Sequence, residues 1–126
     1  MSVADMREPT FLLLTALTTG PRHGYALIEA VRELSGDRVR LKPGSLYATL
    51  ERLAREGLVT ESGVEVVSGR HRRYYELTDV GFDELAGQVE RLEGLASKAS
   101  EGLRRHRSTR AQTRSGAGAV VVGDAS

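Results

Sequence analysis

The apolar residues of segment 79–105 recur in alternating steps of four and three, and this spacing constrains the chain more than any other feature. Such steps place apolar side chains along one stripe of an α-helix, as in the seam of a coiled coil. A helix over this segment would be about 40 Å long, so it cannot bury its whole stripe against one small domain. We therefore expect two copies of the chain to pair through the stripe, with packing on its own domain as the alternative. The stripe comprises Leu85, Val89, Leu92, Ala96, Ala99 and Leu103.

The rest of the chain predicts a mainly α fold with a small β-hairpin. With 126 residues, the chain is the size of one domain. Apolar residues at helical spacing predict three helices before residue 58, and glycine-bounded β-branched and aromatic runs predict two strands. The expected elements are helices at 8–17, 23–34, 42–57 and 79–105, a short extended segment at 38–41, and strands at 58–61 and 73–77 joined by a long tip over 62–72. We assign residues 1–7 to a flexible leader, 8–78 to the main domain, 79–105 to the pairing helix and 106–126 to a disordered tail.

Three local patterns add detail to this outline. His23 is expected to cap the helix that it precedes, and Thr78 or Asp79 is expected to cap the last helix. Tyr74 and Tyr75 alternate along a strand, so one side chain should enter the core and the other should be partly exposed.

The third helix combines a narrow apolar face with a face of small polar residues and arginine. The apolar stripe comprises Leu46, Leu50 and Leu53, and the opposite face comprises Ser45, Ala48, Thr49 and Arg52. The major groove of duplex DNA admits one helix, which needs small residues for close approach and a few long donors to reach base edges. Because helix, helix, short strand, helix and hairpin is the order of a winged helix-turn-helix, we predict that this helix recognises DNA.

Positive charge gathers in the middle of the chain, although the net charge is only +1. Residues 36–75 hold eight Lys or Arg against five Asp or Glu, whereas residues 76–110 hold six against seven. Arginine offers a planar donor fork that suits phosphate and guanine, although genomic codon bias is a simpler reason for its abundance. We expect Arg70, Arg72 and Arg73 of the hairpin to meet the DNA backbone or minor groove, with a solvated turn as the alternative.

Four stretches together resemble the PadR family of bacterial transcriptional regulators over residues 8–81. They are Pro21–Tyr25, Leu41–Tyr47, Leu50–Leu53 with Glu56–Val59, and Gly69–Tyr75 with Leu77, Thr78 and Gly81. Two positions depart from the family pattern, because Ala48 and His71 stand where members commonly have proline. These departures leave the expected fold unchanged but obscure the base preference. The single C-terminal helix is similar to that of the short branch of the family.

The resemblance implies a homodimeric repressor that binds double-stranded DNA at a palindromic operator. The predicted DNA-binding residues are Tyr25, Lys42, Ser45, Tyr47, Thr49, Arg52, Arg70, Arg72 and Arg73. Two of them have structural alternatives, since Tyr47 could pack at the helix edge and Arg52 could pair with Glu56 one turn later.

The resemblance also implies regulation at the dimer interface. Phe11 and Leu14 are expected to join the stripe of the last helix in dimerisation. A small-molecule effector is expected in a cleft that Phe11, Leu14 and Leu92 line, with control by the abundance of the regulator as the alternative.

Several other classes of protein find little support in the sequence. The longest aliphatic run, Phe11–Leu14, is far shorter than the ~20 residues that span a bilayer, and no secretion signal is visible, so we expect a cytoplasmic protein. There is no cysteine and the three histidines are isolated, so we expect neither a metal, a cofactor nor an enzyme. A winged helix that binds only protein is the main alternative. RNA binding is a third, which the scarcity of exposed aromatic residues disfavours.

Overall fold

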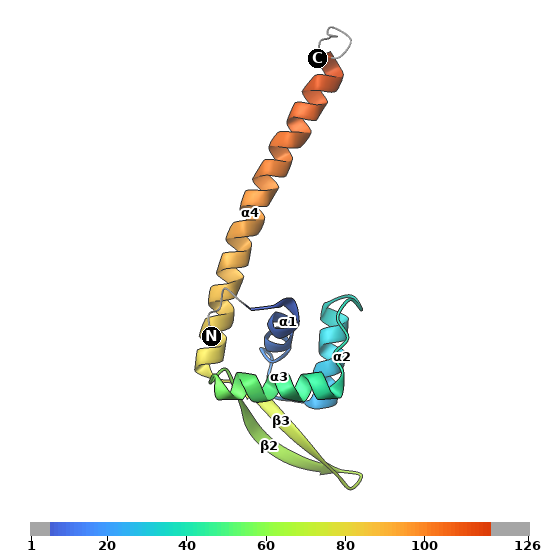
Figure 1. Ribbon diagram of the computed structural model, residues 1–126, viewed down its shortest axis with the longest axis vertical. Helices are drawn as coiled ribbons and strands as arrows, with labels where there is room; N and C mark the ends of the chain where they lie inside the picture. Colours follow the sequence, from blue (N-terminus) through green and yellow to red (C-terminus); the bar gives the residue numbers. More distant parts are fainter. Residues whose placement is uncertain (1–5, 117–126) are drawn as a thin grey trace. The chain divides into compact units, whose positions relative to one another are not determined.

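The computed structural model describes residues 6–116 and contains, within that range, four helices and a three-stranded antiparallel sheet. The mainly α class with a β-hairpin is therefore confirmed. Three helices precede the hairpin and one follows it (Figure 1). The elements are α1 (Glu8–Ala16), β1 (Arg22–His23), α2 (Gly24–Leu34), α3 (Pro43–Arg55), β2 (Val59–Val67), β3 (Arg70–Leu77) and α4 (Asp79–Gly116).

Leucines from α1, α2 and α3 form most of the core. α1 is apolar on nearly every side, and Leu13 and Leu14 have no exposed surface. The stripe predicted for α3 is confirmed, because Leu46, Leu50 and Leu53 are all fully buried. Burial of each such side chain contributes about 1.5–3 kcal/mol, so this cluster fixes how α3 is held.

His23 fixes the start of α2 and also contacts the hairpin. Its Nδ1 accepts a hydrogen bond from the backbone N–H of Ala26 at 3.3 Å, which confirms the predicted cap. The edge of its ring meets Tyr74, with the ring centroids 5.4 Å apart. The expected alternation of the tyrosines is also confirmed, since Tyr75 is buried and Tyr74 is half-buried.

The third strand of the sheet is formed by residues 22–23, which the sequence pattern does not predict. β1 pairs antiparallel with β3 and occupies the edge that β2 leaves free. The segment 38–41, expected to be extended in a strand-like pattern, forms no strand. Its backbone is bound locally instead, because the amide of Val39 donates to Ser35 Oγ at 2.9 Å and Ser35 Oγ lies within hydrogen-bond distance of the Val39 carbonyl.

β2 and β3 form a hairpin, called the wing below, whose strands are longer than predicted. The long tip expected over 62–72 is wrong, because the turn consists of Ser68 and Gly69 alone. Both residues have positive φ, at 52° and 76°, as a tight two-residue hairpin turn requires. Gly63, which falls within the predicted tip, lies instead at a register shift inside β2, where the strand bulges and continues.

Thr78 caps α4 as predicted. Its Oγ1 accepts a hydrogen bond from the backbone N–H of Gly81 at 3.0 Å and donates one to the carbonyl of Gly57 at 2.6 Å. The cap therefore also ties the start of α4 to the turn after α3.

Gly81 permits a close approach between α4 and the chain before β2. A Cβ added at Gly81 would lie 2.1 Å from the carbonyl oxygen of Leu58, whereas one added at Gly94 would meet nothing within 4 Å. We expect Gly81→Ala to lower the free energy of unfolding by about 1–3 kcal/mol, because a backbone carbonyl cannot move aside cheaply. The control Gly94→Ala should raise it by up to ~1 kcal/mol through helix propensity. Urea unfolding followed by circular dichroism measures both, and a stabilised Gly81→Ala variant would contradict the close approach.

Both ends of the described chain differ from the sequence predictions. Met6, assigned to a flexible leader, is buried and belongs to the core. α4 continues to Gly116, so its predicted end at 105 and the disorder predicted for the following residues are wrong there. Arginine, glutamine and alanine are good helix formers, and their share of this segment outweighs the serines and threonines that suggest a tail. Residues 1–5 and 117–126, which hold the rest of both predicted segments, lie outside the described residues.

The chain divides into two units, Met1–Val89 and Glu90–Ser126. The boundary falls within α4, whereas the sequence places the end of the main domain at residue 78. The first turns of α4 belong with the winged helix because Leu85 and Gln88 are buried there.

Candidate nucleic-acid interface

Two exposed tyrosines stand at the contact between α2 and α3. Tyr25 is 63% exposed and Tyr47 is 42% exposed, and together with Ile28 and Pro43 they line a shallow depression. Gly24 makes this arrangement possible, because a Cβ added there would lie 2.3 Å from the hydroxyl oxygen of Tyr47. A side chain at this position would therefore displace the Tyr47 ring. Gly24 and Tyr47 are distant in sequence, so only the fold reveals the requirement for glycine.

The surface of α3 continues onto the wing. Tyr47 lines a second hollow together with His71 and Arg73 of β3. Arg73 is exposed and lies 3.9 Å from Glu61, a loose ion pair across the two strands. We call the surface formed by Tyr25, Tyr47, His71 and Arg73 the α3–wing surface. His71 is not among the DNA-binding residues predicted from the sequence.

The wing presents unpaired positive charge. Arg70 and Arg72 make no hydrogen bond or ion pair with any residue from 6 to 116. Arg72 lies opposite Glu65 in the strand register, but the Glu65 carboxylate accepts a hydrogen bond from the Tyr74 hydroxyl at 2.6 Å. This bond raises the pKa of the Tyr74 hydroxyl above its ordinary value, so the hydroxyl stays protonated and continues to donate. Arg70 and Arg72 are therefore available to an anionic partner.

The first turn of α3 adds polar groups to the same region. Lys42 and Ser45 are exposed, and Thr49 is half-buried one turn further along. No side chain caps this helix, so its first backbone N–H groups are open. An uncapped N-terminus at the positive end of the helix dipole favours a phosphate or another anion.

Arg52 differs from the other predicted contacts because it connects α3 to α1. Its guanidinium donates to Thr10 Oγ1 at 3.2 Å and lies 3.4 Å from the Glu56 carboxylate. Thr10 itself is buried. The alternative that Arg52 pairs with Glu56 is confirmed, and its guanidinium is engaged within the chain.

Replacing Arg52 with alanine should therefore affect stability more than specificity. We expect the free energy of unfolding to fall by about 1–2 kcal/mol, because the buried Thr10 hydroxyl loses its partner. The ratio of affinities for a cognate and a random duplex should stay within about twofold of the wild-type ratio, since a lost base contact would cost ~1–3 kcal/mol of discrimination. Urea unfolding and competition binding measure the two effects. If the variant instead showed relaxed specificity and unchanged stability, Arg52 would be identified as a residue that contacts a base.

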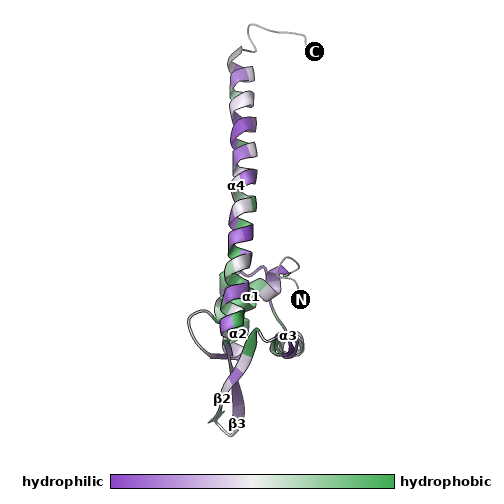
Figure 2. Cartoon of the chain, turned by 90° about the vertical axis from the view of Figure 1, so that its left-hand side faces the viewer, coloured by the Kyte–Doolittle hydropathy of each residue, from purple (hydrophilic) through white to green (hydrophobic). Residues whose placement is uncertain are grey.

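The stripe predicted to pair two copies is largely open in the single chain. Val89, Leu92 and Leu103 are exposed, as are Ala96 and Ala99. Leu95 adds to this apolar surface, and Figure 2 shows hydrophobic positions alternating with hydrophilic ones along this part of α4.

Two residues predicted for dimerisation lie in the core instead. Leu14 is fully buried within its own chain and Leu85 is almost so. The prediction failed for them because helical spacing identifies an apolar face without showing which neighbour covers it. Phe11 is only partly buried, so part of its side chain remains accessible.

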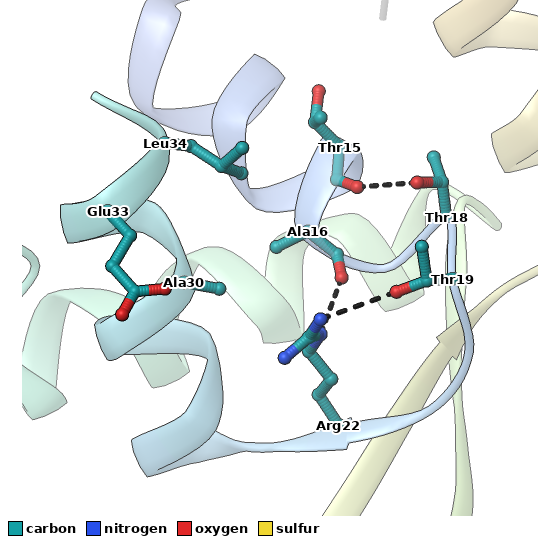
Figure 3. Close-up of a pocket in the computed structure, with 8 residues that line it drawn as sticks. All are labelled: Thr15, Ala16, Thr18, Thr19, Arg22, Ala30, Glu33 and Leu34. Carbon is teal, nitrogen blue, oxygen red and sulfur yellow. Dashed lines mark hydrogen bonds between the residues drawn. The ribbon is translucent and has the colours of Figure 1, made fainter. Parts of the chain in front are cut away.

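One hollow of the winged helix lies between the end of α1 and the second half of α2 (Figure 3). Arg22 forms part of its wall, donating from Nε to the carbonyl of Ala16 at 2.8 Å and from Nη2 to Thr19 Oγ1 at 3.3 Å. The residues that line it are Thr15, Ala16, Thr18, Thr19, Arg22, Ala30, Glu33 and Leu34. None of the residues expected to line an effector cleft takes part in it, and Leu14 is too deeply buried to line a cleft of any kind in this conformation.

Residues 6–116 contain no group of three His, Cys, Asp or Glu side chains that could hold a metal ion. In the same range, no helix is both long enough and apolar enough to cross a bilayer.

Three helices followed by a two-stranded wing, with exposed tyrosines on α2 and α3 and unpaired arginines on the wing, define a winged helix-turn-helix protein of the DNA-binding type. Residues 13–87 match the Transcriptional regulator PadR-like family, and this match covers more than half of the chain. The protein therefore belongs to the PadR-like family of transcriptional regulators, which confirms the resemblance seen in the sequence.

Individual relatives agree with this assignment. The transcriptional regulator Rv3488 of Mycobacterium tuberculosis is 42% identical over 80 residues, which cover 64% of this chain and 71% of the relative. An uncharacterised 37.1 kDa protein in transposon TN4556 of Streptomyces fradiae is 38% identical over 94 residues, or 75% of this chain, but the match spans only 26% of that relative. Bacillus subtilis PadR, whose crystal structure is a complex with operator DNA, is 26% identical with a TM-score of 0.59, and the match covers 66% of this chain and 47% of that one.

Proposed function

We propose that the protein is a homodimeric, sequence-specific repressor that binds palindromic operator DNA. The observation that carries the proposal is the α3–wing surface, where exposed tyrosines lie with His71 and Arg73 beside a helix whose outer face bears small side chains. The wing adds the unpaired Arg70 and Arg72. The operator complex of the Bacillus subtilis relative supports duplex DNA as the partner.

In the proposed complex, α3 enters the major groove and the wing follows the backbone beside it. Ser45, Tyr47 and Thr49 would face the base edges, where short side chains allow close approach. Arg70 and Arg72 would bind phosphates, for which the arginine fork is well suited. The remaining proposed contacts are Tyr25, Lys42 and Arg73. Arg52 is omitted because its guanidinium is engaged with Thr10 and Glu56.

The proposed dimer forms through the exposed stripe of α4. Pairing two stripes buries apolar side chains that are otherwise open to water, and it relates two winged helices by a two-fold axis. A two-fold dimer binds an operator whose half-sites are inverted and lie about one or two helical turns apart.

A small-molecule effector and a cytoplasmic location complete the proposal. An effector would release the repressor by binding more tightly to a dimer geometry that does not fit the operator. The bacterial cytoplasm is where a regulator of this family would meet its operator DNA.

The proposal is tested by titrating the protein against the DNA upstream of its own gene, with a scrambled duplex of equal length as control. We expect tight binding to the upstream DNA alone, with log K falling by about 0.9 per phosphate contact for each unit of log salt. Equal binding to both duplexes would show that the protein binds DNA but that its operator is not in the DNA upstream of its own gene.

A winged helix that binds only another protein is the second candidate. The net charge of +1 favours it, because most DNA-binding domains are more basic. Absence of binding to either duplex at low salt would select this candidate.

A further inference from the structure

The last turns of α4 carry a cluster of positive charge that neither the winged helix nor the apolar stripe uses. Residues 102–115 include no acidic residue. All long side chains of this segment are exposed up to Arg114. Hydrophilic residues predominate in this part of the helix (Figure 2). The cations are Arg104, Arg105, Arg107, Arg110 and Arg114.

These cations fall into two sets. Arg104 and Arg105 both pair with Glu101, at 2.8 and 3.1 Å. The other set, Arg107, Arg110 and Arg114, makes no hydrogen bond or ion pair with any residue of the described chain. We call this second set the arginine triad.

The arginine triad lies on one face of the helix. Steps of three and four residues place side chains above one another, and the three arginines line a shallow hollow together with Ala111. The small alanine leaves space between the guanidinium groups. The face can therefore receive an anionic group that contacts more than one arginine at once.

A second copy of the chain is a poor partner for this face. If the stripe continued past Leu103 with the same spacing, Arg110 would occupy a seam position and meet its counterpart in the other chain. Like charges at such a position repel. The apolar stripe therefore ends at Leu103, and the turns after it are available to a different partner.

A membrane surface is also a poor partner. Helices that lie on membranes combine basic residues with an opposite face of large apolar side chains. Residues 104–114 contain no large apolar residue, and Ala111 is their only aliphatic one. This segment can therefore bind phosphate groups, but it has no apolar face that would insert into lipid.

We propose that the arginine triad binds the phosphate backbone of duplex DNA as a second contact, independent of base sequence and separate from the α3–wing surface. Arginine binds phosphate through two parallel N–H donors, and one helix face with three such groups can follow successive phosphates. The inference rests on the proposed function for the identity of the partner. It adds a contact that raises affinity for all duplexes and makes binding more sensitive to salt.

The test compares full-length variants on a fluorescent random duplex of about 30 base pairs between ~50 and ~200 mM salt. The variant R107Q/R110Q/R114Q removes the triad, and glutamine preserves helix propensity. Its plot of log K against log salt should become shallower by about 2.7 for each engaged helix, which is a ~40-fold change in the ratio of affinities at the two salt concentrations. The control R104Q/R105Q, whose arginines already pair with Glu101, should keep the wild-type slope. Circular dichroism verifies that the helix persists in both variants.

Three results would overturn the inference. An unchanged slope in the triad variant, with the wing variant R70Q/R72Q showing a shallower one, would leave the proposed function intact and remove this contact. If R104Q/R105Q changed the slope equally for each charge removed, net charge alone would account for the effect of the triad variant. Binding of wild type to phosphatidylglycerol vesicles that the triad variant loses, with an unchanged DNA slope, would identify a membrane as the partner. If wild type bound neither random nor upstream DNA, the proposed function itself would fail.

Discussion

Replacing Leu92 with glutamate should convert the proposed dimer to a monomer and reduce operator affinity by about 10²–10⁴-fold. Leu92 is exposed at the middle of the α4 stripe, between Val89 and Ala96. In a two-fold dimer two new carboxylates would face each other across an apolar seam, where burial of an unpaired charge is costly. The loss of affinity follows because a monomer engages one half-site and forfeits the effective concentration that linkage gives the second. Sedimentation velocity measures the mass, and fluorescence anisotropy with operator DNA measures the affinity.

Gly94→Glu is the matched control for this prediction. It introduces the same charge two residues further along α4, on the opposite face of the helix from Leu92, where an added Cβ would meet nothing within 4 Å. This variant should sediment as the wild type does and bind the operator as tightly. If Leu92→Glu kept the wild-type mass, pairing through the α4 stripe would be contradicted. If it became monomeric yet bound the operator at full strength, the dimer would have no role in DNA binding.

Features that depend on neighbouring residues could be predicted from the sequence. The caps at His23 and Thr78 are hydrogen bonds to amides three residues later, so the residue types and their spacing were sufficient. The buried stripe of α3 follows from the periodicity of its leucines. The alternation of Tyr74 and Tyr75 follows from the geometry of any strand.

Features that depend on distant partners could not be predicted in this way. β1 is a strand only because the edge of β3 lies beside it, and two residues carry no periodicity that would reveal this. In the wing, Gly63 and Gly69 look alike in the sequence, but one sits at a bulge and the other in the turn. The pairing register distinguishes them, and register is a property of both strands together.

The candidate site shows the same division. Exposure of Tyr25 and Tyr47 agrees with their predicted role, as does the absence of a partner at Arg70 and Arg72 within the described chain. Arg52, by contrast, has the right residue type on the right helix face, but α1 supplies Thr10 within reach of its guanidinium. A helical face predicted from spacing alone includes residues that a neighbouring element will bind. The structure is needed to separate these residues from the ones left for a ligand.

Removing the two unpaired wing arginines should weaken binding to every duplex by a similar factor. Arg70 and Arg72 are proposed to contact phosphates, which carry no sequence information. With two wings in a dimer, R70Q/R72Q removes four contacts, so the slope of log K against log salt should become shallower by about 3.6. When salt rises from ~50 to ~200 mM, the factor by which affinity falls should therefore be about 150 times smaller for the variant than for wild type. The ratio of operator to random affinity should stay nearly constant, and anisotropy titrations on both duplexes measure it.

R38Q/R40Q removes the same charge from arginines outside the wing and provides the control. Arg38 is paired with Glu8 and Arg40 with Asp37, so these guanidinium groups are engaged within the chain. The control should keep the wild-type slope if phosphate contacts at the wing cause the effect. A shallower slope in the control would mean that the loss of net charge causes the change seen in R70Q/R72Q. A wing variant that lost operator binding while keeping its affinity for random DNA would contradict backbone contact, because only a base-reading side chain discriminates between the two duplexes.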